Sequence, residues 1–234
     1  MRSTASTHRD REVLDLWERG VGLDRWRRDD ALLSDDAPRG LGERNAALLA
    51  LRNTLFDRAW PLKSSCPACG TDCAFEVDSV ALAECLRLPG QGCGSFEWGG
   101  RPLTARAPTV DDIAAISRAT DRASAVRALL ERCIDGDLEL AAVDDAAIDE
   151  LGERLERLDP GALVAFQLVC PACRHEWSAM LDVGEALWLE LQRAAERTLA
   201  DVDALARAYG WTEAEVMQLS PTRRAAYLQL VGGA

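Results

Sequence analysis

Two short segments of the chain repeat one another about a hundred residues apart. The first, Cys66–Gly70, reads CPACG, and the second, Cys170–His175, reads CPACRH. A CxxC turn directs two thiolates at one ion, and two such turns complete the tetrahedral sulfur shell that is typical of structural zinc. The spacing therefore predicts one zinc ion that joins distant parts of the chain. Its predicted ligands are Cys66, Cys69, Cys170 and Cys173.

Other uses of the cysteines fit the pattern less well. A single CxxC pair also occurs in thioredoxin-like redox sites, and reduced cysteines pack as small hydrophobic side chains. Cys73 and His175 are substitute metal ligands, although His175 fits better as the first residue of a strand. The three other cysteines lack partners at metal-ligand spacing, which predicts ordinary core or surface thiols. They are Cys85, Cys93 and Cys133.

The composition points to a cytoplasmic, folded protein. The 234 residues are 48% hydrophobic, and neither a secretory h-region nor a bilayer-spanning apolar run is visible in the sequence. We therefore expect a cytoplasmic location, reduced thiols and no membrane partner. The 39 acidic residues outnumber the 27 basic ones, which gives a net charge of −12. This excess disfavours nucleic acid as a partner, because binding to phosphates normally uses the opposite charge.

The flanks of the CPAC turns have the alternating pattern of half-buried strands, and most of the remaining chain has helical periodicity. The predicted fold is α+β, mostly helical, with a small antiparallel zinc ribbon split by a helical insertion. The predicted strands are 74–78, 94–98, 101–106, 164–169 and 176–181. The predicted helices include 24–33, 41–55, 110–119, 122–134, 144–157 and 184–209.

These elements predict five regions along the chain. They are an N-terminal helical region (1–60), the first half of the ribbon (61–107), a helical insertion (108–160), the second half of the ribbon (161–183), and a long helix with a helical hairpin (184–234). Helix caps support the helical parts: Thr7 is predicted to cap the first helix, Thr212 with Glu215 forms a capping box, and Ser220 precedes a helix that begins at Pro221.

Sequence motifs of catalysis are absent. The chain has no GxxxxGK[ST], GxGxxG, HExxH or GxSxG pattern. A hydrolytic zinc also needs an open coordination position, which four thiolates would close. We therefore expect no enzymatic activity and no catalytic residues, with a zinc-dependent hydrolase as the alternative that sulfur-only coordination would exclude.

Several segments together resemble one protein family. They are residues 41–52, the two CPAC turns, residues 209–215 and residues 219–228. The family consists of zinc-ribbon proteins of contractile phage tails and extracellular contractile injection systems, described as similar to the baseplate hub assembly chaperone of T-even phages. The resemblance implies an assembly chaperone or minor baseplate component, which binds baseplate, hub, spike or tube proteins and can be incorporated in a tail-like particle. It transfers no catalytic residues.

Candidate partner contacts lie in the C-terminal region, although each also suits internal packing. They are Trp188, Trp211, Arg223, Arg224 and Tyr227. The alternative function is that of a nucleic-acid-binding zinc-ribbon regulator. Its support would be the basic residues of segment 25–28 around Trp26, which Asp29 and Asp30 offset at once.

Overall fold

The computed structural model describes residues 2–34, 37–86, 90–137 and 143–232, with residues 2–7 as backbone only. The fold is mixed α+β. Helices make up 57% of the chain and strands 20%, and the strands form small antiparallel sheets, so the predicted helix-dominated α+β class is confirmed. The chain divides into two compact units. Unit 1 contains the chain up to Ser34, Thr54–Phe56 and the chain from Gly184 onward, and unit 2 contains the described residues between them.

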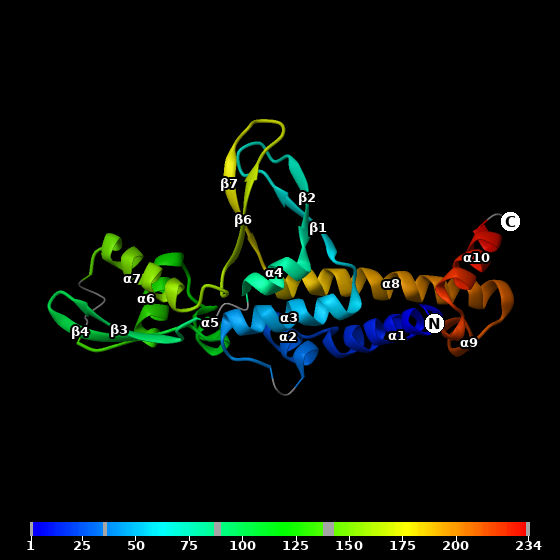
Figure 1. Ribbon diagram of the computed structural model, residues 1–234, viewed down its shortest axis with the longest axis horizontal. Coiled ribbons are helices and arrows are strands. Elements are labelled where there is room, and N and C mark those ends of the chain that lie inside the picture. The colour runs from blue at the N-terminus through cyan, green and yellow to red at the C-terminus, as the bar shows by residue number, and fades with distance from the viewer. Residues whose placement is uncertain (1, 35–36, 87–89, 138–142, 233–234) are drawn as a thin grey trace. The chain divides into compact units, whose positions relative to one another are not determined.

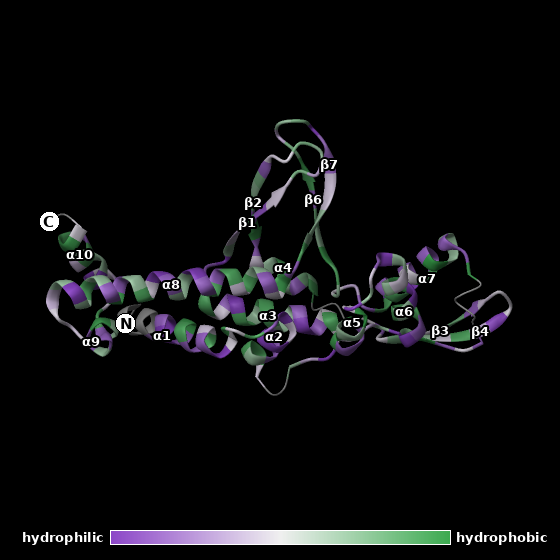
Figure 2. Ribbon diagram, turned by 180° about the vertical axis from the view of Figure 1, so that it is seen from behind, coloured by the Kyte–Doolittle hydropathy of each residue, from purple (hydrophilic) through white to green (hydrophobic). Residues whose placement is uncertain are grey.

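Unit 1 is helical. Its elements are α1 (Arg2–Gly20), α2 (Arg25–Leu33), α8 (Val183–Tyr209), α9 (Glu213–Gln218) and α10 (Pro221–Gly232). The long helix α8 buries Leu187, Leu191, Ala195 and Leu205, which recur near the helical period and form one apolar face. Its apolar and polar residues alternate along its length (Figure 2). Among the described residues, no helix has both the length and the apolar character that crossing a bilayer requires.

Three helices of unit 1 begin within one residue of where the sequence predicts. The Asp24 side chain accepts a hydrogen bond from the Arg27 backbone N–H, Thr212 and Glu215 form a complete capping box, and α10 begins at Pro221. The cap predicted at Thr7 is wrong, because α1 begins earlier, at Arg2. One cap contributes only about 1 kcal/mol, and the preceding residues include no Gly or Pro that would stop a helix.

Unit 2 contains the sheets and the remaining helices. The helices are α3 (Leu41–Leu55, of which the last two residues belong to unit 1), α4 (Ser79–Leu86), α5 (Val110–Ile116), α6 (Arg122–Cys133) and α7 (Asp145–Leu158). The strands are β1 (Ala59–Ser65), β2 (Asp72–Asp78), β3 (Cys93–Trp98), β4 (Arg101–Arg106), β5 (Ile134–Asp135), β6 (Val164–Val169) and β7 (Glu176–Leu181). They form three antiparallel sheets in the orders β1-β2, β3-β4-β5 and β6-β7.

The two hairpins that carry the CPAC turns are built alike. The last pair of β1 and β2 is Ser65 with Asp72, and the last pair of β6 and β7 is Val169 with Glu176. In each hairpin, a six-residue turn that starts with CPAC follows directly. The hairpins lie side by side with their turns at the same end (Figure 1), and the rings of Phe75 and Phe166 contact across them at a centroid distance of 5.5 Å.

Helix α3 anchors the bases of both hairpins. Arg52 is buried and stacks over the Trp60 ring at 4.7 Å, and it donates a 2.8 Å hydrogen bond to Ser79 Oγ at the end of the first hairpin. The Asn45 side chain donates to the Gly161 carbonyl at 2.9 Å, just before the second hairpin. Polar contacts from one helix thus fix the points where both hairpins leave the body of unit 2.

The segment between the hairpins has a core of its own. Its buried members are Ala105, Leu130, Cys133, Ile148, Leu151, Leu155 and Leu158. The predicted strands 94–98 and 101–106 exist as β3 and β4, which pair with each other, and β4 also pairs with β5. Neither pairs with a hairpin that carries a CPAC turn. The strands of the two CPAC hairpins are therefore β1, β2, β6 and β7, and three of the elements in unit 2, β1, α4 and β5, were not predicted.

Candidate metal centre

The four predicted ligands come together at the tips of the two hairpins. The Sγ atoms of four cysteines all lie within 4.8 Å of one another: those of Cys66, Cys69, Cys170 and Cys173. The Sγ atoms of Cys66 and Cys173 are 3.7 Å apart, and those of Cys69 and Cys170 are 3.6 Å apart. A tetrahedral ion with metal–sulfur bonds of about 2.3 Å has sulfur–sulfur edges of about 3.8 Å. The cluster is therefore the right size for one ion.

The backbone of each turn shows how the sequence produces this geometry. The Cys66 N–H donates to the Thr71 carbonyl at 2.9 Å, and the Gly70 N–H donates to the Cys66 carbonyl at 2.9 Å. The second turn repeats both bonds: the Cys170 N–H donates to His175 at 2.9 Å, and the Arg174 N–H donates to Cys170 at 3.0 Å. Two equivalent turns, facing each other, direct two pairs of thiols at one point.

Both turns pass through the left-handed region of backbone conformation at the residue after the CPAC sequence. Gly70 has a φ of +73°, and Arg174, at the equivalent position, has a φ of +63°. Glycine adopts this conformation readily, whereas a residue with a Cβ atom adopts it at a cost. The two turns thus share one shape although only the first has the residue that favours it.

Hydrogen bonds within the turns favour a thiolate at Cys170. The backbone N–H groups of Cys173 and Ala172 donate to its sulfur and, against the opposing effect of burial, lower the pKa of Cys170 to about 6. A hydrogen bond between the Thr71 side chain and the Cys69 sulfur likewise lowers the pKa of Cys69. At Cys173 a hydrogen bond from the His175 backbone N–H also acts to lower the thiol pKa. Burial and the neighbouring thiols outweigh it and raise the pKa of Cys173 to about 12. A metal ion would displace that proton, because metals bind the thiolate.

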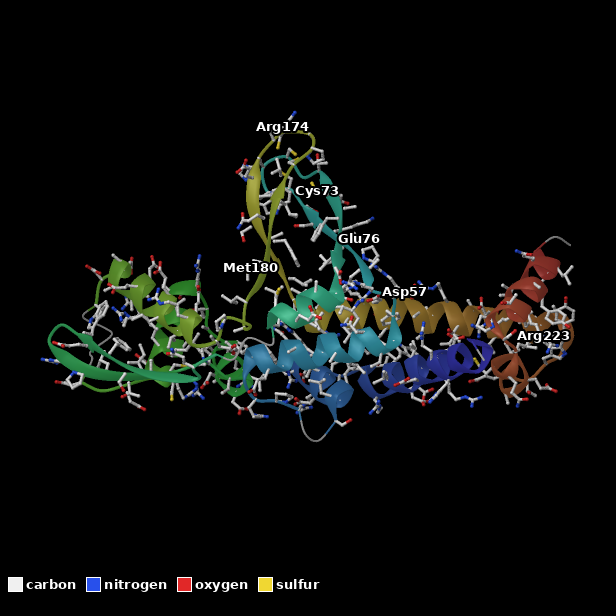
Figure 3. All side chains as sticks on the ribbon, viewed as in Figure 1. Asp57, Cys73, Glu76, Arg174, Met180 and Arg223 are labelled. Carbon is white, nitrogen blue, oxygen red and sulfur yellow. The ribbon has the colours of Figure 1, made fainter. Side chains whose placement is uncertain are left out.

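Apolar side chains close the underside of the cluster. Cys66 and Cys170 are buried, and Cys73 and Trp177 pack against them from equivalent positions of the two hairpins. Figure 3 shows Cys73 below the tip that carries Arg174. Burial, together with the nearby Cys170, raises the pKa of Cys73. Cys73 therefore packs beneath the cluster as a protonated thiol, and within the described residues the four-sulfur group does not include it.

The other sulfur and imidazole candidates lie elsewhere. His175 is exposed, directly precedes β7, and stacks its ring on Trp177 at a centroid distance of 6.4 Å. Cys85 and Cys93 are exposed, whereas Cys133 lies in the core of the segment between the hairpins. The expectation of ordinary surface and core thiols thus agrees with where these three cysteines lie.

Two of the predicted partner contacts, Trp188 and Arg224, lie inside unit 1. Arg28 stacks over the Trp188 ring at 4.9 Å. Arg224 pairs with Asp10 on α1 and, at 3.4 Å, with Asp201 on α8. These contacts favour a role in the packing of unit 1, and contact of either residue with a partner stays a prediction.

The other three candidates have exposed surface near the end of α8. Trp211 and Tyr227 join Tyr209 in a cluster of three rings with centroid distances of 4.8, 4.8 and 5.6 Å, and Arg223 is exposed on α10. Tyr209, 40% exposed, belongs to this cluster but was predicted only as the last residue of the helix 184–209. The three rings pack directly on one another and join the end of α8 to α10.

Comparison of the chain with protein-family models, with curated proteins and with solved structures finds no match. A functional interpretation therefore depends on the geometry of the cysteine cluster and on the sequence.

Proposed function

We propose that the chain is a non-enzymatic assembly chaperone, or a minor baseplate component, of a contractile phage tail-like injection system, and that a structural zinc ion holds its two cysteine hairpins together. The observation that carries the structural metal is the group of four sulfur atoms within 4.8 Å of one another, and the assembly role rests on the sequence resemblance. A shell of four thiolates leaves no position for water or substrate, so an ion held there would stabilise structure and would not act in catalysis.

Zinc is the metal that this donor set favours. Tetrahedral sulfur coordination is typical of zinc and of iron–sulfur centres, and two CxxC pairs in a small β-hairpin ribbon are the usual setting for zinc. The ion would join residues 101 and 107 positions apart in the chain. It would therefore fix the relative position of two hairpins whose strands do not pair with each other.

A protein partner fits the charge of the chain better than nucleic acid does. The net charge is −12, and the basic segment near Trp26 is already engaged within unit 1. Arg25 stacks on Trp26, Arg27 pairs with Asp24 at 3.5 Å, and Arg28 pairs with Glu185. The resemblance to baseplate hub assembly chaperones supports baseplate, hub, spike or tube proteins as the partners.

The metal is tested on the purified full chain. We expect one zinc per chain by elemental analysis, and an X-ray absorption spectrum with four sulfur neighbours at about 2.3 Å. Cys170→Ser should lose the zinc, whereas the matched control Cys85→Ser, which changes an exposed thiol outside the cluster, should retain it. Nitrogen or oxygen neighbours in the spectrum, or zinc retained by Cys170→Ser, would overturn the structural site.

The assembly role is tested by capture of tail proteins encoded beside the gene. We expect the zinc-loaded chain to retain a baseplate, hub, spike or tube protein, and the Cys170→Ser variant to retain less. Failure to retain any of them would refute the role. An electrophoretic shift of DNA or RNA with a steep dependence on salt would instead support a nucleic-acid-binding regulator.

A further inference from the structure

A cavity of about 550 Å³ lies between strand β3 and helix α7 in unit 2. Strand β3 is at the outside of the sheet, with β4 on one side and no strand beyond it among the described residues. The strand lines the cavity with Gly94, Ser95 and Phe96, and the helix lines it with residues near its end. The lining residues of the helix are Arg154, Arg157 and Leu158.

The lining shows that the cavity follows the edge of the strand. Successive side chains of a strand point to opposite faces, so a cavity that touches three successive residues reaches the edge of the strand. The cavity also extends over the face of the sheet to Ala105 of β4. Gly94 and Ser95 have little or no side-chain bulk at this part of β3. Residues 154, 157 and 158 have the spacing of one helix face. A free strand edge opposite a helix is the shape that accepts an extended peptide as an added strand.

The charge of the cavity is opposite to that of the chain. Among the described residues that line it, the only charged ones are Arg154 and Arg157, in a protein with a net charge of −12. Each is also paired with a glutamate of its own helix, Arg154 with Glu150 at 2.9 Å and Arg157 with Glu153 at 3.7 Å. The Arg154 guanidinium lies over the Phe96 ring at 4.7 Å and 5.7 Å from the Trp98 ring centre, which fixes its plane. Its buried Nε has no hydrogen-bond partner. A guanidinium has five N–H donors, so Arg154, which is held on a ring and donates one hydrogen bond to Glu150, keeps donors for a second carboxylate.

The loop before β3 closes one end of the cavity. The Gly92 N–H donates to the Leu158 carbonyl at 3.1 Å, and a Cβ atom on Gly90 would lie 2.4 Å from the same carbonyl oxygen. The loop backbone therefore rests directly on the end of α7, in a place where only glycine fits. A groove that is closed at one end accommodates a chain that stops, and not one that continues.

We propose that the groove between β3 and α7 binds the C-terminal segment of a partner protein as an added strand. The terminal carboxylate lies against Arg154 and Arg157, and an apolar last side chain lies against Phe96, Ala105 and Leu158. This inference deepens the proposed function, on which it rests, because it names the part of a partner that the assembly factor holds.

The test measures binding of fluorescent hexapeptides to the full zinc-loaded chain by fluorescence anisotropy. The peptides end in Leu, Ile, Val or Phe, have mixed preceding residues, and are made both as free acids and as C-terminal amides. We expect the free acids to bind at least tenfold more tightly than the amides. Equal binding of acids and amides, or no binding of either, would overturn the inference.

Two variants and a control assign the binding to the groove. Arg157→Gln removes an exposed charge, and Arg154→Lys retains the charge but loses the planar fork; each should weaken binding of the acids about tenfold. Arg207→Gln changes an exposed arginine of unit 1 and should have no effect. Binding unchanged by Arg157→Gln, a variant that leaves the core intact, would refute the site. Capture of a tail protein without peptide binding refutes the groove alone, whereas peptide binding without capture of any tail protein refutes the assembly role alone.

Discussion

The matched positions Gly70 and Arg174 allow the energy of the CPAC turns to be measured by exchange. A residue with a Cβ atom in the left-handed region destabilises the fold by about 1–2 kcal/mol. Arg174→Gly would remove this cost from the second turn. The new glycine also adds freedom to the unfolded chain, which costs about 0.4–1 kcal/mol. We therefore expect Arg174→Gly to raise the free energy of unfolding by about 0.5–1 kcal/mol.

The reverse change at the first turn should have the opposite sign. A Cβ atom at Gly70 would meet no atom within 4 Å, so Gly70→Ala alters the backbone preference without a steric clash. We expect it to lower the free energy of unfolding by about 0.5–1 kcal/mol. A difference between the two variants of about 1–2 kcal/mol follows.

Urea unfolding at saturating zinc, monitored by tryptophan fluorescence, measures both variants under one condition, and competition with a chelator measures their zinc affinities. Arg174 is exposed, so the loss of its side chain should have little effect of its own. If Arg174→Gly proved as destabilising as Gly70→Ala, the side chain of Arg174 would be stabilising the turn, and the argument from backbone conformation would be refuted.

Three further predictions concern the packing and the metal. Hydrogen bonds from Arg106 hold the pKa of the buried Asp112 well below its usual range. The stabilisation that ionised Asp112 gives the folded chain is therefore complete above about pH 4 and is lost as the pH falls further. Asp112→Asn should lower the free energy of unfolding by about 2–3 kcal/mol at pH 7 and make it depend less on pH in acid, as measured by urea unfolding. In Gly184→Ala the new Cβ atom would lie 2.6 Å from a carboxylate oxygen of the buried Asp29, so the free energy of unfolding should fall by about 1–3 kcal/mol and the melting temperature should fall with it. The control Gly152→Ala, whose new Cβ atom would meet open space, should raise the free energy of unfolding by up to about 1 kcal/mol. Mass spectrometry after iodoacetamide treatment should find the four cluster thiols labelled only when a chelator has removed the zinc; labelling of all four in the metal-loaded chain would contradict a closed sulfur shell.

Local signals in the sequence were sufficient for most helices and for the cysteine cluster. Asp24 and the Thr212–Glu215 box act within one helical turn, so their effect does not depend on the rest of the fold. The CPAC repeat similarly contains each half of the sulfur cluster within four residues. The sequence could not give the relative placement of the two halves, which depends on contacts such as those of Arg52 and Asn45 on α3.

The missed elements in unit 2 have weak or misleading local signals. Strand β1 contains Pro61, which argues against a strand unless its partner pattern is known. Helix α4 had a signal that could have been used: Asp78 accepts hydrogen bonds from the N–H groups of Val80 and Ala81, as a capping residue does. The helix follows β2 without a break, and nothing was predicted for the residues that follow the strand 74–78.

Strands β3 and β4 show a different limit of sequence reasoning. Their alternation and the intervening glycines predicted a hairpin, and that hairpin exists. Its nearness to the first CPAC turn along the chain favoured a place in the ribbon, but its third strand is the two-residue β5, about thirty residues further on. A pairing of only two residues leaves no pattern in the sequence, so the sheet to which a hairpin belongs is decided by tertiary contacts.

The separation of the two CPAC turns also sets an order of events during synthesis on the ribosome. The cysteines that meet in the cluster are 101 and 107 residues apart, and a ribosome adds about 5–20 residues per second. The first turn therefore waits roughly 5–20 s with two thiols before the other two ligands exist. During that interval it is open to oxidation and to capture of other thiophilic ions. If the cluster holds the proposed zinc ion, newly made chains would be damaged at this step under zinc starvation or oxidative stress, while finished molecules that hold the ion would survive.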